Sequence, residues 1–213
     1  MKYNNKHQLY LVTEEDMPLQ QLMTIIKDAA AGGAGIVQLR EKNLDSKSFY
    51  EKALSLKKFL DELSIPLVIN DRADIALAVG ANGIHLGQSD LPLDVVKQIV
   101  PDSMMIGISA HNEEEAVLAE EKGADYIGVG SVFPTSSKAD ADRLPEGMLA
   151  RIIDAVSIPV VAIGGIHIEN SGQLQEYDLD GIAVISAITR AENPKWAAQQ
   201  LLKNAFGAVN VQQ

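Results

Sequence analysis

The chain has 213 residues, of which 46% are hydrophobic and 22% charged, the composition of an ordinary globular domain. This composition excludes wholesale disorder, a collagen helix and a coiled coil. The formal net charge of −11 opposes binding to nucleic acid and acidic membranes, although a local cluster of cations can still hold a small anionic substrate. The lack of cysteine excludes disulfides, thiolate catalysis and thiolate-bound zinc.

The amino-terminal stretch carries no targeting pattern. Residues Met1–Gln8 are polar, and the apolar run Leu9–Val12 that follows is far shorter than the roughly 20 residues of a membrane span. We therefore expect a cytoplasmic protein. No linker or low-complexity tract divides the chain, so we expect a single domain over 1–213, with about 207–213 as a flexible tail.

Short apolar runs rich in valine and isoleucine recur along the chain and predict buried parallel strands. The eight runs are Leu9–Thr13, Ile36–Glu41, Leu67–Asp71, Gly83–Gly87, Met105–Ser109, Tyr126–Gly130, Val160–Gly164 and Ile182–Ser186. Amphipathic segments predict helices at Pro18–Ala31, Ser46–Leu63, Asn112–Lys122 and Pro194–Phe206. We expect Ser46 to cap the second of these helices and Asn112 the third, where Glu115 would complete a capping box.

Eight units, each a strand followed by a helix-like stretch, predict a single (β/α)₈ TIM barrel of the α/β class. A doubly wound open sheet is the alternative, but the chain carries no nucleotide-binding fingerprint. The active site of a TIM barrel lies at the carboxyl ends of its strands. Functional residues are therefore expected directly after each apolar run.

Glycine and serine end the last two predicted strands, where TIM barrels often bind phosphate. Gly164 and Gly165 would let a ligand approach the backbone closely. Ser186 and Ala187 would open a short helix whose free N–H groups face the phosphate. A plain tight turn and a helix cap at Ser186 are the alternatives, but the pairing of the two features on neighbouring strands favours phosphate.

Charged residues follow several other strands. Asp71 and Asp90 follow adjacent strands, and carboxylates beside phosphates suit Mg²⁺, although a helix cap explains each of them equally well. Arg40 and Lys42 follow the second run and Lys138 the sixth. Together these cations would offset a ligand with two or three negative charges, whereas a salt bridge at the barrel rim would explain one cation alone.

Hydroxyl groups and histidines give weaker signals. The loop Thr135–Lys138 offers donors for a second phosphate, unless it is an ordinary polar turn. His85 and His111 end or follow strands, and a lone strand histidine is more often a hydrogen-bonded core residue than a catalyst. We expect Tyr10 to pack in the core.

Taken in order along nearly the whole chain, these pieces resemble the thiamine phosphate synthase family of (β/α)₈ enzymes. The matching segments are 37–42 (VQLREK), 69–72 (INDR), 83–90 (GIHLGQSD), 107–111 (GISAH), 123–130 (GADYIGVG), 133–138 (FPTSSK), 159–166 (PVVAIGGI) and 181–188 (GIAVISAI). Each is short, but eight in order at strand ends make a specific match. The chain has Gly130-Ser131 where the family often has Gly-Pro, Ala110 where Thr or Val is common, and Ser137 where Thr is common.

The resemblance implies the joining of 4-amino-5-hydroxymethyl-2-methylpyrimidine diphosphate to 4-methyl-5-(2-phosphoethyl)thiazole, which gives thiamine phosphate and diphosphate. By position, the residues implied to hold the pyrimidine diphosphate are Gln38, Leu39, Arg40, Glu41, Lys42, Asn70, Ser109 and Lys138. Those implied to hold the thiazole phosphate are Thr135, Ser136, Ser137, Gly165, Ile185 and Ser186. Asp71 and Asp90 would bind Mg²⁺, and the expected catalytic residues are Arg40, Lys42, Ser109 and Lys138.

Two alternatives stay open. A thiazole phosphate tautomerase would use a base such as His111 and no metal, but such relatives tend to lose the paired aspartates and the loop lysine that this chain keeps. A catalytically silent barrel that senses thiamine intermediates would need no group to stabilise a leaving diphosphate. On every alternative, small phosphorylated molecules are the expected partners, without nucleic acid or membrane, and a homo-oligomer is left open.

Overall fold

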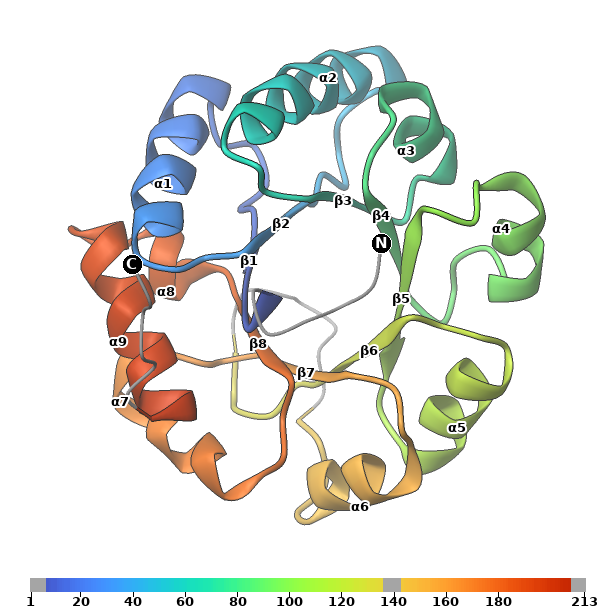
Figure 1. Cartoon of the computed structure of the whole chain (residues 1–213), viewed down its shortest axis with the longest axis vertical. Coiled ribbons are helices and arrows are strands. Elements are labelled where there is room, and N and C mark those ends of the chain that lie inside the picture. Colours follow the sequence, from blue (N-terminus) through green and yellow to red (C-terminus); the bar gives the residue numbers. More distant parts are fainter. Residues whose placement is uncertain (1–6, 136–142, 208–213) are drawn as a thin grey trace.

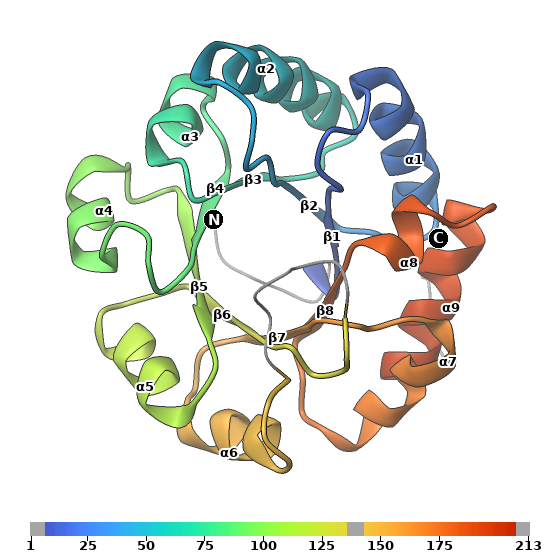
Figure 2. The same ribbon diagram turned by 180° about the vertical axis from the view of Figure 1, so that it is seen from behind.

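The computed structural model describes residues 7–135 and 143–207. Its eight parallel strands form a closed barrel in the order β1 to β8, and β8 pairs with β1 to close the ring. The helices lie outside this ring, as the two end-on views show (Figure 1, Figure 2). The predicted (β/α)₈ barrel is confirmed, whereas the predicted tail lies outside the described residues apart from Gly207.

The strands are short and almost wholly buried. Their bounds are β1 Leu9–Val12, β2 Ile36–Leu39, β3 Leu67–Asn70, β4 Gly83–Leu86, β5 Met105–Ala110, β6 Tyr126–Val129, β7 Val160–Ile163 and β8 Gly181–Val184. Most end one or two residues earlier than the predicted runs. The polar residues that follow therefore belong to the loops at the carboxyl ends of the strands, where a site can form.

Helices follow the strands around the outside of the barrel. Their bounds are α1 Leu19–Ala31, α2 Ser46–Glu62, α3 Ala73–Val79, α4 Leu93–Ile99, α5 Glu113–Glu121, α6 Met148–Ala155, α7 Ile168–Ser171, the 3₁₀ helix η2 Gly172–Glu176, α8 Ser186–Thr189 and α9 Pro194–Phe206. Within the described ranges, none of these helices combines the length and the apolar character that crossing a membrane requires.

The helix caps test two of the predictions. The Asn112 side chain accepts a hydrogen bond from the backbone N–H of Glu115 at 2.8 Å, so the predicted cap of α5 is confirmed. The prediction for Ser46 is wrong, because Asp45 is the cap of α2 and accepts from the backbone N–H of Ser48 at 3.0 Å. Ser46 is already the first residue of the helix, one position too late to cap it.

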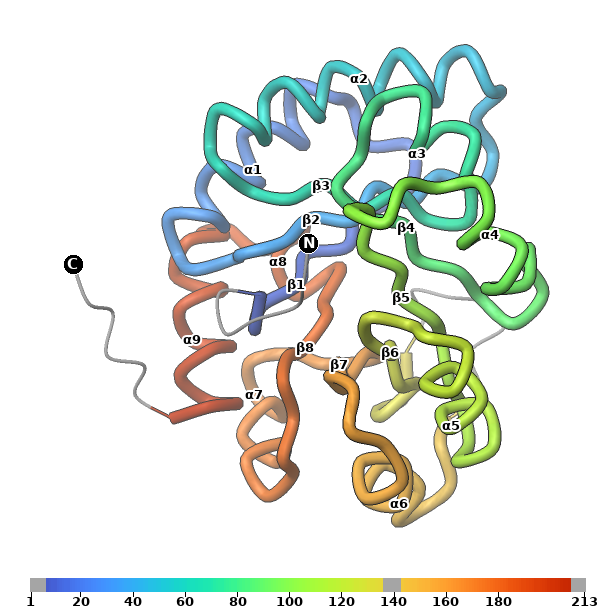
Figure 3. Tube along the Cα trace, turned by 45° about the vertical axis from the view of Figure 1, so that its right-hand side comes forward, coloured from blue at the N-terminus to red at the C-terminus, as the bar shows by residue number. Residues whose placement is uncertain are grey.

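Apolar side chains form two layers, one inside the barrel and one between the strands and the helices. Along β1 the side chains alternate between them, since Tyr10 and Val12 belong to the inner cluster and Leu9 and Leu11 to the outer one. In the tube view, α1, α2 and α3 cover one side of the barrel and α5, α6 and α7 the opposite side (Figure 3). The core is therefore closed by helices, and the strand ends are left for the site.

Candidate active site

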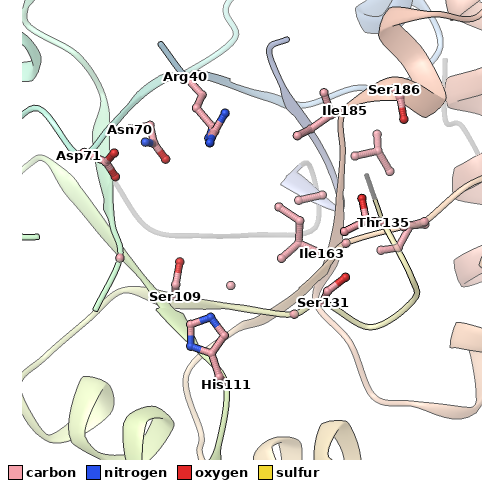
Figure 4. Close-up of a pocket in the computed structure, with 18 of the residues that line it drawn as sticks. Arg40, Asn70, Asp71, Ser109, His111, Ser131, Thr135, Ile163, Ile185 and Ser186 are labelled. Atoms are coloured by element: carbon pink, nitrogen blue, oxygen red, sulfur yellow. The ribbon is translucent and has the colours of Figure 1, made fainter. Parts of the chain in front are cut away.

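A cavity of about 520 Å³ lies at the carboxyl ends of the strands, a volume typical of small-ligand sites. The predicted site residues that line it are Arg40, Lys42, Asn70, Asp71, Asp90, Ser109, Thr135, Gly165, Ile185 and Ser186. In the close-up, Arg40, Asn70 and Asp71 lie on one side of the cavity and Thr135 and Ser186 on the other (Figure 4). The barrel thus brings together residues that are far apart in the sequence.

Three predicted ligand residues of the second strand and its loop are described but do not belong to the cavity lining. Gln38 is buried inside the barrel, where its amide Nε2 donates to the Tyr10 hydroxyl at 2.9 Å. Leu39 packs in the outer core, and Glu41 forms a buried ion pair with Lys52. In this segment, Arg40 and Lys42 are the predicted residues that line the cavity. The predicted residues Ser136, Ser137 and Lys138 lie outside the described residues.

The aspartates of the predicted metal site do not cap helices. The cap positions of α3 and α4 are held by Arg72 and Pro92, so the cap alternative for Asp71 and Asp90 is wrong. Asp71 has a left-handed φ of 62°, and its backbone N–H donates to the carbonyl of His85 at 2.8 Å. This conformation is uncommon for a residue with a side chain and costs free energy, so it needs support from the surrounding structure.

The two carboxyl groups interact with one another. Burial first, and the neighbouring Asp71 carboxyl next, raise the pKa of Asp90, while the backbone N–H of Gly87 acts against this by donating to Asp90 Oδ2 at 2.6 Å. Lys42 forms an ion pair with Asp71, and its positive charge acts weakly against the raised pKa of Asp90. The pair is thus an electrostatically unfavourable arrangement of like charges that a cation would relieve.

The carboxylate pair fits Mg²⁺ if a ligand completes the coordination. Within the described residues, no three His, Cys, Asp or Glu side chains come together as a metal site. Mg²⁺ is usually bound by one or two carboxylates together with water and substrate phosphates, rather than by a cage of protein ligands. Asp71 and Asp90 provide this number of carboxylates at the edge of a cavity large enough for a phosphorylated ligand.

Two of the predicted cations, Arg40 and Lys42, have carboxylate partners at the barrel rim. The Arg40 guanidinium forms an ion pair with Glu15, and its backbone N–H donates to Thr13 Oγ1 at 3.0 Å. The Lys42 side chain is 47% exposed, so it keeps access to solvent beside its partner Asp71. Both cations line the cavity, so an anionic ligand would have to exchange with these carboxylates or share the cations with them.

The loops after β6 and β7 lie in close contact at the second half of the cavity. Gly164 and Gly165 have left-handed φ values of 101° and 64°, and a Cβ on Gly165 would lie 2.3 Å from the carbonyl oxygen of Pro134. A side chain at this position would therefore collide with the neighbouring loop. Ile185, and not Ser186, holds the cap position of α8, so the cap alternative for Ser186 is also wrong.

His111 lines the cavity as an exposed side chain, with its ring Nδ1 2.9 Å from Glu115 Oε2. Sequence reasoning missed Ser131, Ile163 and His167, which also line the cavity. Ile163 ends β7, and Ser131 lies two residues after β6, so strict use of the strand-end rule would have found both. His167 lies in the loop between β7 and α7 and gave no comparable signal.

Comparisons with known proteins agree on one family. A family model described as thiamine monophosphate synthase matches residues 9–188. A thiamine-phosphate synthase of Clostridium tetani is 50% identical over 91% of this chain and 93% of its own length. One of Methanobrevibacter smithii is 46% identical over 95% of this chain and 96% of its own length. The structure of a thiamine phosphate pyrophosphorylase from Pyrococcus furiosus superposes with a TM-score of 0.84 at 40% identity, covering 94% of this chain and 96% of that one.

Proposed function

The chain belongs to the thiamine monophosphate synthase family, and we propose that it joins 4-amino-5-hydroxymethyl-2-methylpyrimidine diphosphate to 4-methyl-5-(2-phosphoethyl)thiazole. The products are thiamine phosphate and diphosphate. The observation that carries this proposal is the composition of the cavity, in which a half with cations and carboxylates meets a half with glycines and hydroxyl groups. On this proposal, the two phosphorylated substrates lie side by side in one cavity.

The first half suits the pyrimidine diphosphate. Arg40 and Lys42 would bind diphosphate oxygens, because a guanidinium fork and an ammonium point charge both pair strongly with phosphate. Asn70 and Ser109 line the same half and would fix the orientation of the ligand. On this proposal, diphosphate oxygens take the place of Glu15 as the partner of Arg40.

Asp71 and Asp90 would hold Mg²⁺ at this half of the site. When bound, the ion supplies positive charge beside the leaving diphosphate. Lys42 lies against Asp71, so the carboxylates also orient a cation of the protein itself. The raised pKa of Asp90 supports this assignment, because carboxyl groups with perturbed pKa values gather at functional sites.

The reaction needs no protein nucleophile. The bond between the pyrimidine methylene carbon and the diphosphate oxygen breaks, the diphosphate leaves with the electron pair, and the 4-amino pyrimidine ring stabilises the resulting cation. The thiazole nitrogen then donates its electron pair to the methylene carbon and forms the new C–N bond. Arg40, Lys42 and, from the resemblance, Lys138 would stabilise the charge that grows on the leaving group.

The second half suits the thiazole phosphate. The backbone of Gly165, the hydroxyl groups of Thr135 and Ser186 and the start of α8 all border it. Ile185 would provide an apolar contact beside the thiazole ring. Holding the ring nitrogen close to the methylene carbon would give it an advantage over water as the attacking group.

A thiazole phosphate tautomerase is the second candidate, and the contact between His111 and Glu115 favours it. A histidine oriented by a carboxylate is a common general base, and this one lines the cavity. A tautomerase would need neither metal nor a diphosphate substrate. We also propose a cytoplasmic location.

The purified protein can be tested directly with both precursors and Mg²⁺. We expect thiamine phosphate, detected by oxidation to its fluorescent thiochrome derivative, and we expect none when either precursor is left out. A reaction mixture that isomerises the thiazole phosphate but forms no thiamine phosphate would instead support the tautomerase.

A further inference from the structure

A chain of hydrogen bonds crosses the barrel interior and ends at the cavity. Gln38 Nε2 donates to Tyr10 Oη at 2.9 Å, and Tyr10 Oη lies 2.9 Å from Tyr126 Oη. Tyr126 Oη lies 3.0 Å from His85 Nδ1, and His85 Nε2 lies 3.0 Å from Ser109 Oγ. These five described side chains come from β2, β1, β6, β4 and β5, and among them Ser109 lines the cavity.

Two glycines on neighbouring strands make room for this chain. A Cβ on Gly107 would lie 2.1 Å from the Tyr126 ring, and a Cβ on Gly128 would lie 3.0 Å from His85 Cε1. The first of these contacts is impossible and the second is very tight. Gly107 on β5 and Gly128 on β6 therefore leave the space in which the two rings lie side by side, with their centroids 5.5 Å apart.

The Gln38 amide determines which group donates and which accepts in each of these hydrogen bonds. Its N–H donates to the Tyr10 oxygen, and burial raises the pKa of Tyr10, which keeps the hydroxyl protonated. The Tyr10 hydroxyl then donates its one proton to Tyr126 Oη, because a buried hydroxyl proton without an acceptor costs free energy. By the same argument, the Tyr126 hydroxyl donates a hydrogen bond to His85 Nδ1.

The direction of the hydrogen bonds determines the tautomer of His85. If Nδ1 accepts from Tyr126, the neutral ring carries its proton on Nε2, and this N–H donates to Ser109 Oγ. The Ser109 oxygen then accepts from the protein, and its own proton is left for a ligand. A phosphate oxygen is a strong acceptor for such a hydroxyl group.

We propose that His85 and Tyr126 are positioning residues that fix Ser109 as a hydrogen-bond donor to the diphosphate group of the substrate. The inference rests on the proposed function for the identity of that ligand. It also gives Gln38 a role in addition to the ligand contact expected from the resemblance, because its amide sets the order of the protons from the far side of the barrel. The proton order itself can be measured without substrate.

The first test is the tautomer of His85, measured by long-range ¹H–¹⁵N NMR on protein with labelled histidine. The chain has four histidines, and the His85 signals are identified by their loss in His85→Asn. We expect a neutral ring protonated at Nε2 in the wild type, and a substantial Nδ1–H population in Tyr126→Phe. A wild-type ring protonated at Nδ1 or at both nitrogens would overturn the proposal, as would an unchanged tautomer in Tyr126→Phe.

The second test is a kinetic double-mutant cycle, run well below the lowest melting temperature of the set. Loss of a hydrogen bond to a charged ligand should lower kcat about 10- to 100-fold in Ser109→Ala, and Tyr126→Phe should lower it about threefold to tenfold. In the Ser109→Ala background, Tyr126→Phe should change kcat less than about twofold, because its effect passes through Ser109. If the fold-loss of kcat in the double variant equals the product of the losses in the two single variants, Tyr126 acts independently of Ser109 and the proposal is contradicted.

Tyr50→Phe is the matched control, because Tyr50 lies on α2 and is 36% exposed. Its kcat should equal that of the wild type. A wild-type protein that forms no thiamine phosphate would refute the proposed function, whereas the His85 tautomer would still test the hydrogen-bond chain. An active wild type with the wrong tautomer would refute the positioning role alone.

Discussion

The carboxyl group of Asp90 lies against that of Asp71 at the ends of two adjacent strands, and after burial this contact is the main cause that raises the pKa of Asp90. Neither residue caps a helix. Repulsion between like charges at two partly buried residues is unfavourable for folding, and a function would explain why the pair is present. Binding of a divalent cation beside a phosphorylated ligand is the explanation that fits the cavity.

The raised pKa of Asp90 predicts how the stability of the metal-free protein depends on pH. The folded state holds the Asp90 proton more tightly than the unfolded chain, so the protein should lose stability as the pH rises through the folded-state pKa of Asp90. Asp90→Asn stays uncharged and escapes this loss. We expect its melting temperature at pH 7 in a chelator to exceed that of the wild type.

Mg²⁺ should raise the melting temperature of the wild type more than that of Asp90→Asn, so that the wild type becomes the more stable of the two. Asp94→Asn is the control, since Asp94 is an exposed carboxylate on α4 that lies 3.6 Å from Lys122. It should respond to Mg²⁺ as the wild type does. A metal-free Asp90→Asn that melts below the wild type would show that the carboxylate is stabilising and the electrostatic argument wrong.

Removal of either carboxylate charge should impair catalysis while the fold survives. We expect Asp71→Asn and Asp90→Asn to lower kcat about 10²-fold, the usual effect of removing a group that stabilises charge in a transition state. Circular dichroism should stay that of the wild type, and Asp94→Asn should keep full activity. Normal turnover in both site variants would remove the basis for the metal assignment.

Gly165 should be sensitive to a side chain because of its neighbour and not because of its backbone angle. A Cβ there would lie 2.3 Å from the Pro134 carbonyl oxygen, whereas a Cβ on Gly80 would have no atom within 4 Å. The two glycines have nearly the same φ, 64° and 63°, so alanine strains the backbone similarly at both.

We therefore expect Gly165→Ala to raise KM for the thiazole phosphate about tenfold or more, because it displaces the loop that borders this ligand. Gly80→Ala should cost stability but leave KM unchanged. Equal KM values in the two variants would place the thiazole phosphate elsewhere. Crystals grown with product give an independent check, since the phosphate should contact the backbone at Gly165 and Ser186.

Lys138 lies outside the described residues, and its role follows from the resemblance. If it opposes charge on the departing diphosphate, Lys138→Ala should lower kcat about 10²-fold, well beyond any change in KM for the thiazole. Lys138→Arg should restore activity only in part, because a planar fork does not replace a compact charge. A tautomerase should keep its activity in Lys138→Ala and lose it in His111→Ala.

Residues at strand ends could be predicted because a closed parallel barrel places all carboxyl ends at one rim. Asp71 and Asp90 lie in the loops after β3 and β4, and the order of the apolar runs in the sequence was enough to predict that they are neighbours. The side to which a strand residue points was harder to predict. The Gln38 side chain points into the barrel and donates a hydrogen bond to Tyr10. A strand of four residues is too short for its pattern of side chains to predict this direction.

Partners that come from distant loops were beyond the sequence as well. Glu15 pairs with Arg40 across the first two strand ends, and neither apolar periodicity nor spacing links these residues. The helix caps show the same limit at short range. Asp45 and Ser46 are both good capping residues, and the observed choice depends on which of them the chain can hold in an extended conformation.

The central claim is that this protein couples diphosphate release to thiamine phosphate formation. The most direct measurement follows both products in one reaction with Mg²⁺ and both precursors, and repeats it with each precursor omitted. We predict equal amounts of diphosphate and thiamine phosphate from the complete mixture, and loss of both products in the Asp71→Asn and Asp90→Asn double variant. A wild-type protein that binds the pyrimidine diphosphate but releases no diphosphate in the complete mixture would contradict the account.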